Sequence, residues 1–126
     1  GMSLKHRSAR LIECECDSDG GYDALHHLWS LKRQPTAIVA MADVIALGAL
    51  RAAHELEIAV PETLALIGHD DIPASGLVCP PLTTVQQPTV EKGRTAVQTL
   101  IDLLQQTDGV PQHIVLPVTL VERQSS

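Results

Sequence analysis

The sequence predicts an α/β domain in which a parallel sheet is the middle of three layers and helices cover both of its faces. Between residues 11 and 68, segments alternate as strand, helix, strand, helix, strand, which indicates a parallel sheet with right-handed crossovers. The run at residues 64–68 is apolar without polar alternation, as expected for a central strand covered on both faces. A chain of 126 residues forms one such domain with one core.

The first expected strand and helix lie before residue 34. Apolar residues and cysteines alternate with glutamates over residues 11–16, which predicts a strand. Asp17 begins a turn with helix-capping groups, and the apolar residues that follow recur at helical spacing as far as Arg33. Cys14 and Cys16 have the spacing of two ligands of a four-ligand metal site. No second Cys or His cluster stands at a matching interval, which favours a structural role for the two cysteines.

A second strand is expected at residues 36–41 and a helix at 43–57. One narrow apolar stripe of that helix is predicted to pack on the sheet and contains Ile45, Ala49, Ala52 and Leu56. Leu47 and Leu50 project almost opposite, beside His54. These side chains would form a second apolar patch, which is typical of a partner surface. An equally supported alternative is that another helix of the same chain covers the patch.

The last third of the chain continues the sheet and adds one helix. The expected elements are an extended strand or hinge crossing at residues 82–85, a helix with an apolar stripe at 90–104, a turn at 107–109 and short strands at 114–116 and 118–121. Residues 1–4 are expected to be a tag or a disordered start.

Charge and composition exclude several classes of function. Nine Lys and Arg against fifteen Asp and Glu give a net charge of −6, which repels phosphate backbones, so this chain is not expected to bind DNA by itself. It has no export leader and no apolar run of the roughly 18 residues that a membrane span needs, which predicts a cytoplasmic protein without membrane contact. Three cysteines, an odd number, indicate reduced thiols.

Acidic residues follow all three expected strands. Asp70 and Asp71 lie just past the central strand, whereas Asp43 follows the second strand and Asp17 and Asp19 follow the first. Ligands of open α/β sheets bind beyond the carboxyl ends of the strands, where carboxylates suit the hydroxyls of a sugar-like ligand or a hard cation such as Mg²⁺. The earlier acids are also explained as helix caps, but no helix begins at Asp70.

Motifs of common enzymes are missing from the sequence. It contains no glycine-rich phosphate loop, no G-x-S-x-G elbow and no H-E-x-x-H. A phosphoryl-transfer or receiver site needs a lysine beside its acids, and neither Lys5, Lys32 nor Lys92 stands at the end of an expected strand. The sequence therefore predicts a binding protein without catalysis, metal or cofactor, and a metal-dependent enzyme is the weakest of the hypotheses.

Five segments, in order, resemble the carboxyl-terminal part of the lac-repressor family of bacterial transcription regulators. They are residues 35–50, Val60-Pro-Glu62, Leu66-Ile-Gly-His-Asp-Asp-Ile-Pro73, Pro80-Pro-Leu-Thr-Thr-Val-Gln-Gln-Pro88 and Leu116-Pro-Val-Thr-Leu-Val-Glu-Arg123. The resemblance implies a type I periplasmic-binding-protein-like subdomain. In that family a sugar or related metabolite lies between two α/β subdomains and shifts the affinity of a separate helix-turn-helix domain for DNA.

The resemblance also implies roles for particular residues. Asp70 corresponds to the acid that hydrogen-bonds the effector, and Gln87 and Thr89 to positions of the hinge crossing that face the cleft. The residues expected to bind ligand are Asp70, Gln87, Asp43 and Thr89. Leu47, Leu50 and Val78 correspond to positions of subunit pairing. A homodimer is therefore expected, with an interface that contains Leu47, Leu50, His54 and Val78.

Departures from the family pattern are expected to matter. Ala42 stands where members usually carry an asparagine that touches ligand, and His69 stands where an aromatic residue is usual. Residues 5–126 would be a partial effector and dimerisation domain, without the DNA-binding domain and most of the amino-terminal subdomain. The apolar stripe at 90–104 would then lack its usual partner. A solute-binding protein of a sugar transport system has the same fold and is the alternative hypothesis.

Overall fold

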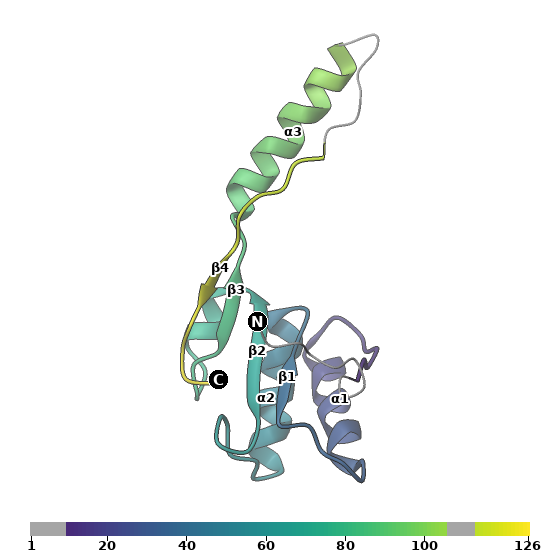
Figure 1. Ribbon diagram of the computed structural model, residues 1–126, viewed down its shortest axis with the longest axis vertical. Coiled ribbons are helices and arrows are strands. Elements are labelled where there is room, and N and C mark those ends of the chain that lie inside the picture. Colours follow the sequence, from purple (N-terminus) through teal and green to yellow (C-terminus); the bar gives the residue numbers. More distant parts are fainter. Residues whose placement is uncertain (1–9, 106–112) are drawn as a thin grey trace, which may run out of the picture.

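In the computed structural model, which describes residues 10–105 and 113–126, a compact body carries one projecting helix (Figure 1). The elements in chain order are α1 (Ser18–Ser30), β1 (Ala37–Val39), α2 (Asp43–Glu55), β2 (Ala65–Asp70), the short 3-10 helix η1 (Pro73–Gly76), β3 (Thr83–Gln86), α3 (Thr89–Gln105) and β4 (Thr119–Val121). The predictions for residues 1–4 and for a turn at 107–109 lie outside the described residues.

The four strands form one sheet in the order β1-β2-β3-β4. β1 pairs with β2 and β2 pairs with β3 in parallel, and β4 is an antiparallel edge strand on β3. The predicted α/β fold with a parallel sheet is confirmed. The register places Gly68 beside Thr84 and Asp70 beside Gln86, so the carboxyl ends of the two central strands coincide.

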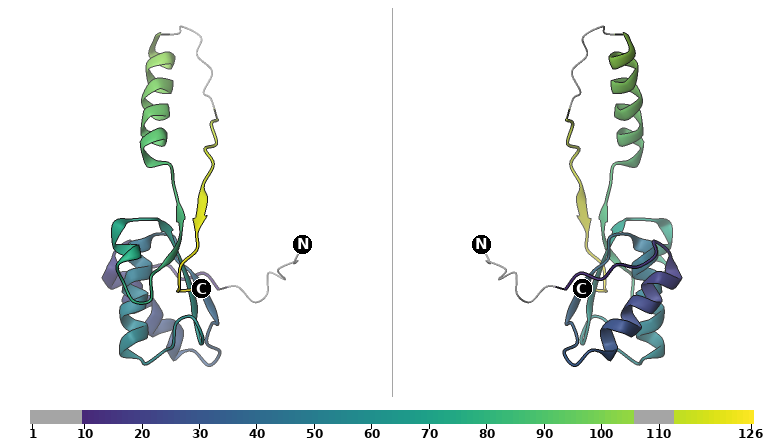
Figure 2. Two further views of the ribbon diagram at one scale, coloured as in Figure 1. Left: turned by 90° about the vertical axis from the view of Figure 1, so that its left-hand side faces the viewer. Right: turned by 90° about the vertical axis from the view of Figure 1, so that its right-hand side faces the viewer.

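The body has a layer of helices on one side of its sheet. α2 packs on β2, and α1 lies beside α2 in the same layer, with Leu25 of α1 in the same core as Leu66 of β2 (Figure 2). Ile38 of β1 faces the core, whereas Ala37 and Val39, which point to the opposite face, are exposed. Among the described residues, the opposite face of β1 is therefore uncovered.

The buried side of α2 is wider than the predicted stripe. Leu50 is only 7% exposed and belongs to the same aliphatic core as Ala46, Ala53 and Leu66. The prediction that Leu50 lies on an exposed partner surface is therefore wrong. The physical reason is that α2 contacts both β2 and α1, so two of its sides are buried and a single-stripe argument assigns too little of the helix to the core.

α1 and α2 approach each other closely at two glycines. A Cβ atom on Gly48 would overlap the backbone carbonyl of Ser18, and one on Gly21 would overlap the carbonyl of Ile45. Hydrogen at these two positions lets the helix backbones touch. The crossing therefore requires glycine for space, and not for an unusual backbone angle.

Two predicted strands do not form. Residues 10–16 have no regular secondary structure and are mostly exposed, and residues 114–116 are also irregular. Alternation of side chains produces a strand only where a neighbouring strand supplies hydrogen bonds, and neither segment has such a neighbour among the described residues. Cys14 and Cys16 are accordingly exposed free thiols, as is Cys79.

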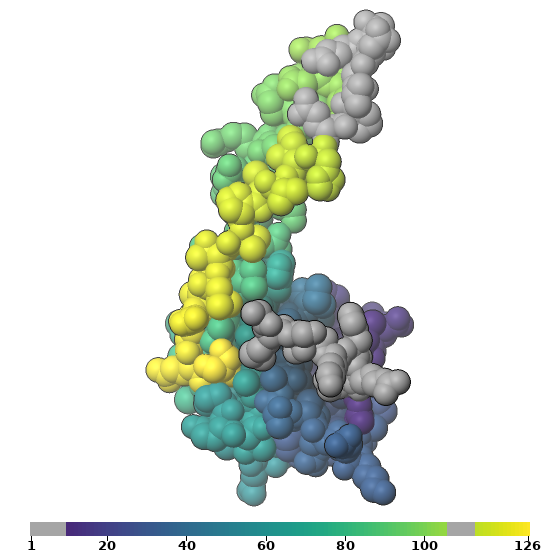
Figure 3. Space-filling view, viewed as in Figure 1, coloured from purple at the N-terminus to yellow at the C-terminus, as the bar shows by residue number. Residues whose placement is uncertain are grey.

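α3 extends away from the body, as the green helix in Figures 1 and 2 shows. None of its residues is buried. Its predicted apolar stripe is present but exposed and contains Val90, Val97, Leu100, Ile101 and Leu104. In the space-filling view, α3 and the yellow carboxyl-terminal segment rise together from the body (Figure 3). The fold of the body therefore positions only the first residues of α3.

Tyr22 of α1 belongs to a polar network with α2. Its hydroxyl donates a hydrogen bond of 2.6 Å to Glu55, and the Arg51 guanidinium lies 4.4 Å from the ring centroid. The hydrogen bond to Glu55 is the main cause that raises the pKa of Tyr22 above its ordinary value, and the charge of Arg51 opposes this effect. The folded state therefore holds the phenol proton more tightly than the unfolded chain does.

This proton gives the stability a pH dependence at alkaline pH. Because the folded pKa of Tyr22 is raised, the stabilisation is complete below the unfolded value near pH 10 and is lost as pH rises through the folded value. Tyr22→Phe should be less stable than the wild type at about pH 8, and the difference should shrink at about pH 11. Urea unfolding at both pH values measures it, and an equal difference at both would contradict the assignment.

Candidate functional site

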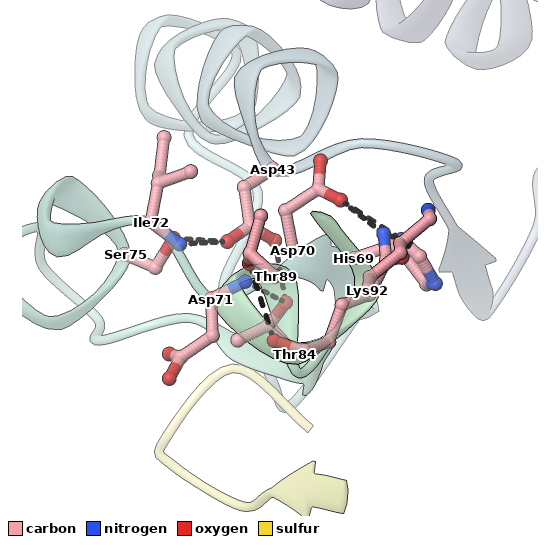
Figure 4. Close-up of polar contacts among 10 residues, drawn as sticks. Asp43, His69, Asp70, Asp71, Ile72, Ser75, Thr84, Thr89 and Lys92 are labelled. Atoms are coloured by element: carbon pink, nitrogen blue, oxygen red, sulfur yellow. Dashed lines mark hydrogen bonds and ion pairs between the residues drawn. The ribbon is translucent and has the colours of Figure 1, made fainter. Parts of the chain in front are cut away.

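The backbone turns sharply where β2 ends. Asp70 and Asp71 both have positive φ angles, of 118° and 55°. Residues other than glycine rarely adopt such angles, and those that do cluster at functional sites. Figure 4 shows these two acids with Asp43 at the carboxyl end of the sheet. The structure thus brings together three of the acids that the sequence singled out.

Asp43 lies beneath this surface and is fully buried. Its Oδ2 accepts hydrogen bonds from the backbone N–H of Ile72 at 3.0 Å and from Ser75 Oγ at 2.6 Å, and its Oδ1 accepts one from Thr84 Oγ1 at 2.5 Å (Figure 4). It does not cap α2 either, because the N-cap position is Ala42. Asp43 therefore joins α2, β3 and the loop after β2, and no surface of it is open to a ligand.

Gly68 of β2 makes room for the Asp43 carboxylate. A Cβ atom at this position would overlap Asp43 Oδ1 and would also press against Leu82. Thr84, which binds the same oxygen, is the register partner of Gly68 on β3. The glycine between the apolar residues and the acids of the central strand is therefore part of the support for the site.

Asp71 is engaged in a second set of contacts. Its Oδ1 forms an ion pair of 2.6 Å with Arg123, and its Oδ2 accepts a hydrogen bond of 2.7 Å from Gln86 Nε2. Arg123 also donates to the carbonyl of Leu82 at 2.7 Å. These contacts hold the end of β2 against the chain that follows β4. Asp71 is largely buried and acts as a structural anchor.

Asp70 is the most accessible of the three acids, with 40% of its side chain exposed. Gln87 Nε2 donates a hydrogen bond of 2.7 Å to Asp70 Oδ1, and His69 Nδ1 lies 3.1 Å from the same oxygen. Lys92 of α3 donates to Gln87 Oε1 at 2.9 Å. Asp70 Oδ2 has no hydrogen bond with any residue that the structure describes, which leaves it available to an outside donor.

A hollow of about 690 Å³ adjoins this cluster. It is lined by Gln86, Gln87, Pro88, Thr89, Val90, Glu91, Arg94 and Thr95. Thr89 donates to the carbonyl of Gln87 through both its backbone N–H, at 2.9 Å, and its hydroxyl, at 3.3 Å. A second hollow, of about 720 Å³, lies between residues 11 and 27. Only the first shares a residue, Gln87, with the polar cluster, so we take it as the candidate site.

The predicted site residues thus fall into three groups. Asp43, which the sequence predicts to bind ligand, is instead fully buried and not open to one. Asp70, Gln87 and Thr89 come together at the rim of the sheet. Asp17 and Asp19 are engaged at α1, where Asp17 accepts a hydrogen bond of 2.7 Å from the Gly20 N–H as the N-cap and Asp19 pairs with Arg51 at 2.9 Å. The sequence instead predicts Asp17 and Asp19 at the same edge of the sheet as the other acids that follow strands.

Sequence reasoning missed three members of the cluster: His69, Lys92 and Arg123. In the sequence His69 is only a departure from the family pattern, although it adjoins the acids directly. Lys92 does not follow a strand, and it reaches the cluster from the first turn of α3. The sequence signal for Lys92 is its position shortly after Gln86 and Gln87, at the end of β3.

The residues expected at a subunit interface differ in how far they are buried. Leu47 and Val78 are partly buried against the core, and His54 is exposed. Leu50 lies inside the core, as described above. Leu77, beside Val78, is 85% exposed and was not singled out from the sequence.

Among residues 10–105 and 113–126, no three His, Cys, Asp or Glu side chains are grouped so that they would hold a metal ion. None of the helices described in these ranges has the length and apolar character that a membrane crossing requires.

A half-exposed acid on a strained turn, at the carboxyl ends of parallel strands and beside a hollow, is an arrangement typical of ligand sites in open α/β domains. The model of the periplasmic binding protein-like domain matches residues 3–126. The chain belongs to this family. Its fold and five sequence segments place it with the carboxyl-terminal part of the effector domain of lac-repressor-like regulators.

Known proteins with similar sequence or structure are transcription regulators. The HTH-type transcriptional repressor PurR of Yersinia pestis is 34% identical over 119 residues, which are 94% of this chain and 35% of the relative. A LacI family regulator from Enterococcus faecalis, solved with bound ribose, is 35% identical with a TM-score of 0.82, over 93% of this chain and 43% of that one.

A second solved structure, the complex of the transcriptional regulator CelR with cellobiose, is 31% identical with a TM-score of 0.83. The match covers 90% of this chain and 35% of CelR. The present chain therefore spans only about a third of the length of the curated relatives that it matches. The similarity establishes the family and the fold of this part.

Proposed function

We propose that this chain is the effector-sensing part of a lac-repressor-like transcription regulator and that its ligand is a sugar or a related metabolite. The observation that carries the proposal is Asp70, whose Oδ2 is free of bonds within the described structure and lies on a strained turn at the edge of the sheet. The similar regulators solved with ribose and with cellobiose support this class of ligand.

The chemistry of the cluster fits a ligand with hydroxyl groups. A carboxylate accepts hydrogen bonds and donates none, so Asp70 selects donors. Gln87 and Thr89 offer an amide and a hydroxyl, which both donate and accept. Aromatic side chains are scarce in this chain, with one Trp and one Tyr, and neither belongs to the cluster. Recognition in this part of the protein would therefore rest on hydrogen bonds to Asp70, Gln87 and Thr89.

Asp70→Ala tests the proposal. Calorimetric titration of the chain with D-ribose and with cellobiose should show weak binding of at least one sugar, and the variant should lose about tenfold or more in affinity, because a hydrogen bond to a charged group contributes roughly 1.5–3 kcal/mol. Asp23→Ala removes an exposed carboxylate of α1 and is the matched control. Unchanged binding by Asp70→Ala, or no binding of any tested sugar or sugar-like metabolite, would reject the assignment.

The proposal extends to partners and location. A homodimer is supported by Leu47 and Val78, which remain partly accessible, by exposed His54 and by the neighbouring exposed Leu77. Leu50 is not part of the proposed interface, because it is buried in the core. DNA contact would belong to a separate domain, because the net charge of −6 gives this chain no basic surface. Such a regulator acts in the cytoplasm and requires no catalysis.

A further inference from the structure

We propose that Gln87 is a positioning residue that occupies Asp70 when no ligand is bound and connects it to α3 through Lys92. A ligand that takes over Asp70 would then release the start of α3. This inference rests on the proposed function, because it assigns Asp70 to the ligand. It adds a mechanism by which an event at the sheet edge reaches a helix outside the body.

The contacts form one continuous path. Asp70 Oδ1 accepts from Gln87 Nε2 at 2.7 Å, and Gln87 Oε1 accepts from Lys92 Nζ at 2.9 Å. Asp70 belongs to the end of β2, Gln87 follows β3 directly, and Lys92 lies in the first turn of α3. The two ends of the Gln87 amide therefore bind two different parts of the molecule.

The lysine also fixes the orientation of this amide. Lys92 carries only donors, so the oxygen of Gln87 must face it and the NH2 group must face Asp70 and His69. Nε2 then donates to Asp70 Oδ1 at 2.7 Å and lies 3.2 Å from His69 Nδ1. His69 Nδ1 is 3.1 Å from the same carboxylate oxygen, a distance that suits an Nδ1–H donor to Asp70.

Asp70 Oδ1 therefore has two neighbouring groups, the Gln87 amide at 2.7 Å and His69 Nδ1 at 3.1 Å. A ligand that takes over this oxygen must displace the Gln87 amide. The side-chain NH2 signals of Gln87 therefore report directly on whether Gln87 occupies Asp70.

α3 is sensitive to this path because none of its residues is buried and it projects from the body (Figure 1). The hydrogen bonds of Thr89 to the Gln87 carbonyl make the turn into α3 continuous with the Gln87 backbone. A ligand hydroxyl that donates to Asp70 Oδ1 replaces the Gln87 amide, and the start of α3 then loses its tether to β2.

NMR spectroscopy of the ligand-free, 15N-labelled chain tests the inference. In the wild type the side-chain NH2 signals of Gln87 should differ from those of an exposed glutamine, and Asp70→Leu should return them to the exposed values. Relaxation of the amides of residues 93–96 should show increased motion relative to the body in Gln87→Leu, Lys92→Met and Asp70→Leu. Loss of one hydrogen bond in the path should speed amide exchange at the start of α3 by about fivefold.

The pattern among variants separates a path from independent contacts. In the double variants of Gln87→Leu with Lys92→Met or with Asp70→Leu, motion of α3 should be no greater than in the single variants, because one break interrupts the whole path. Arg94→Met, which removes a cation two residues further along the helix, is the control and should leave both readouts unchanged. Unchanged amide signals of α2 and β2 show that a variant is folded.

Unchanged Gln87 side-chain NH2 signals in Asp70→Leu, additive effects in the double variants, or an equal effect of Arg94→Met would overturn the inference. All these measurements are made without ligand. Failure of sugars to bind would therefore reject the proposed function, whereas failure of the side-chain and motion tests would reject the path from Asp70 to α3.

Discussion

Asp43→Ala is expected to lower the free energy of unfolding by about 3 kcal/mol or more, because three donors lose the carboxylate that accepts their hydrogen bonds. The substitution leaves the hydroxyls of Ser75 and Thr84 and the N–H of Ile72 without their acceptor. Unpaired buried donors carry a desolvation cost of roughly 1–3 kcal/mol each, and relaxation recovers part of it. Urea unfolding followed by circular dichroism measures the change.

Two further variants test whether the lost stability comes from the buried network around Asp43. Asp43→Asn keeps the shape and one acceptor, so its loss should lie between those of the wild type and Asp43→Ala. Asp23→Ala removes an exposed carboxylate and should change stability by less than about 0.5 kcal/mol. A stability of Asp43→Ala close to that of the wild type would show that the buried network is not what holds α2, β3 and the loop after β2 together.

Gly48→Ala is expected to have the second large effect, a loss of at least about 1–3 kcal/mol, as found for overpacked interiors. The added methyl group would overlap the Ser18 carbonyl, and backbone atoms of α1 can yield only if the two helices move apart. Such a movement would also loosen the contacts between Arg51 and Asp19. The midpoint of urea unfolding measures the effect.

Gly93→Ala is the matched control for this prediction. It makes the same chemical change in α3, where an added Cβ meets nothing within 4 Å. Helix propensity alone then favours the variant, by roughly 0.5–1 kcal/mol for α3, so the unfolding midpoint should not fall. Equal losses from Gly48→Ala and Gly93→Ala would mean that the close approach of α1 and α2 is not the cause.

The central elements were predictable because their signals are local. The uninterrupted apolar run before Asp70 predicts β2, and the acids beyond it predict the functional edge of the sheet. Residues 11–16 show where a local signal fails, because a strand also needs a neighbour. Leu50 shows the same for packing. The elements that contact a helix decide which of its sides are buried, and the sequence of α2 does not contain the position of α1.

The site was predictable only in part for the same reason. Asp70 was identified from its place after a strand, whereas Gln87 and Thr89 came from the family resemblance. Asp43 lies after a strand as Asp70 does, yet it is buried, because Gly68 and Thr84 of neighbouring strands create a space for it. Residue order does not distinguish a carboxylate that faces solvent from one that faces a glycine.

The proposed binding surface is the edge of the sheet at Asp70 together with the adjoining hollow. It is tested by an NMR titration of the 15N-labelled chain with D-ribose at high concentration. The largest shifts should fall on the amides of Asp70, Gln87 and Thr89 and should disappear in Asp70→Ala. Largest shifts at the second hollow between residues 11 and 27, or shifts at the edge that persist in Asp70→Ala, would contradict it.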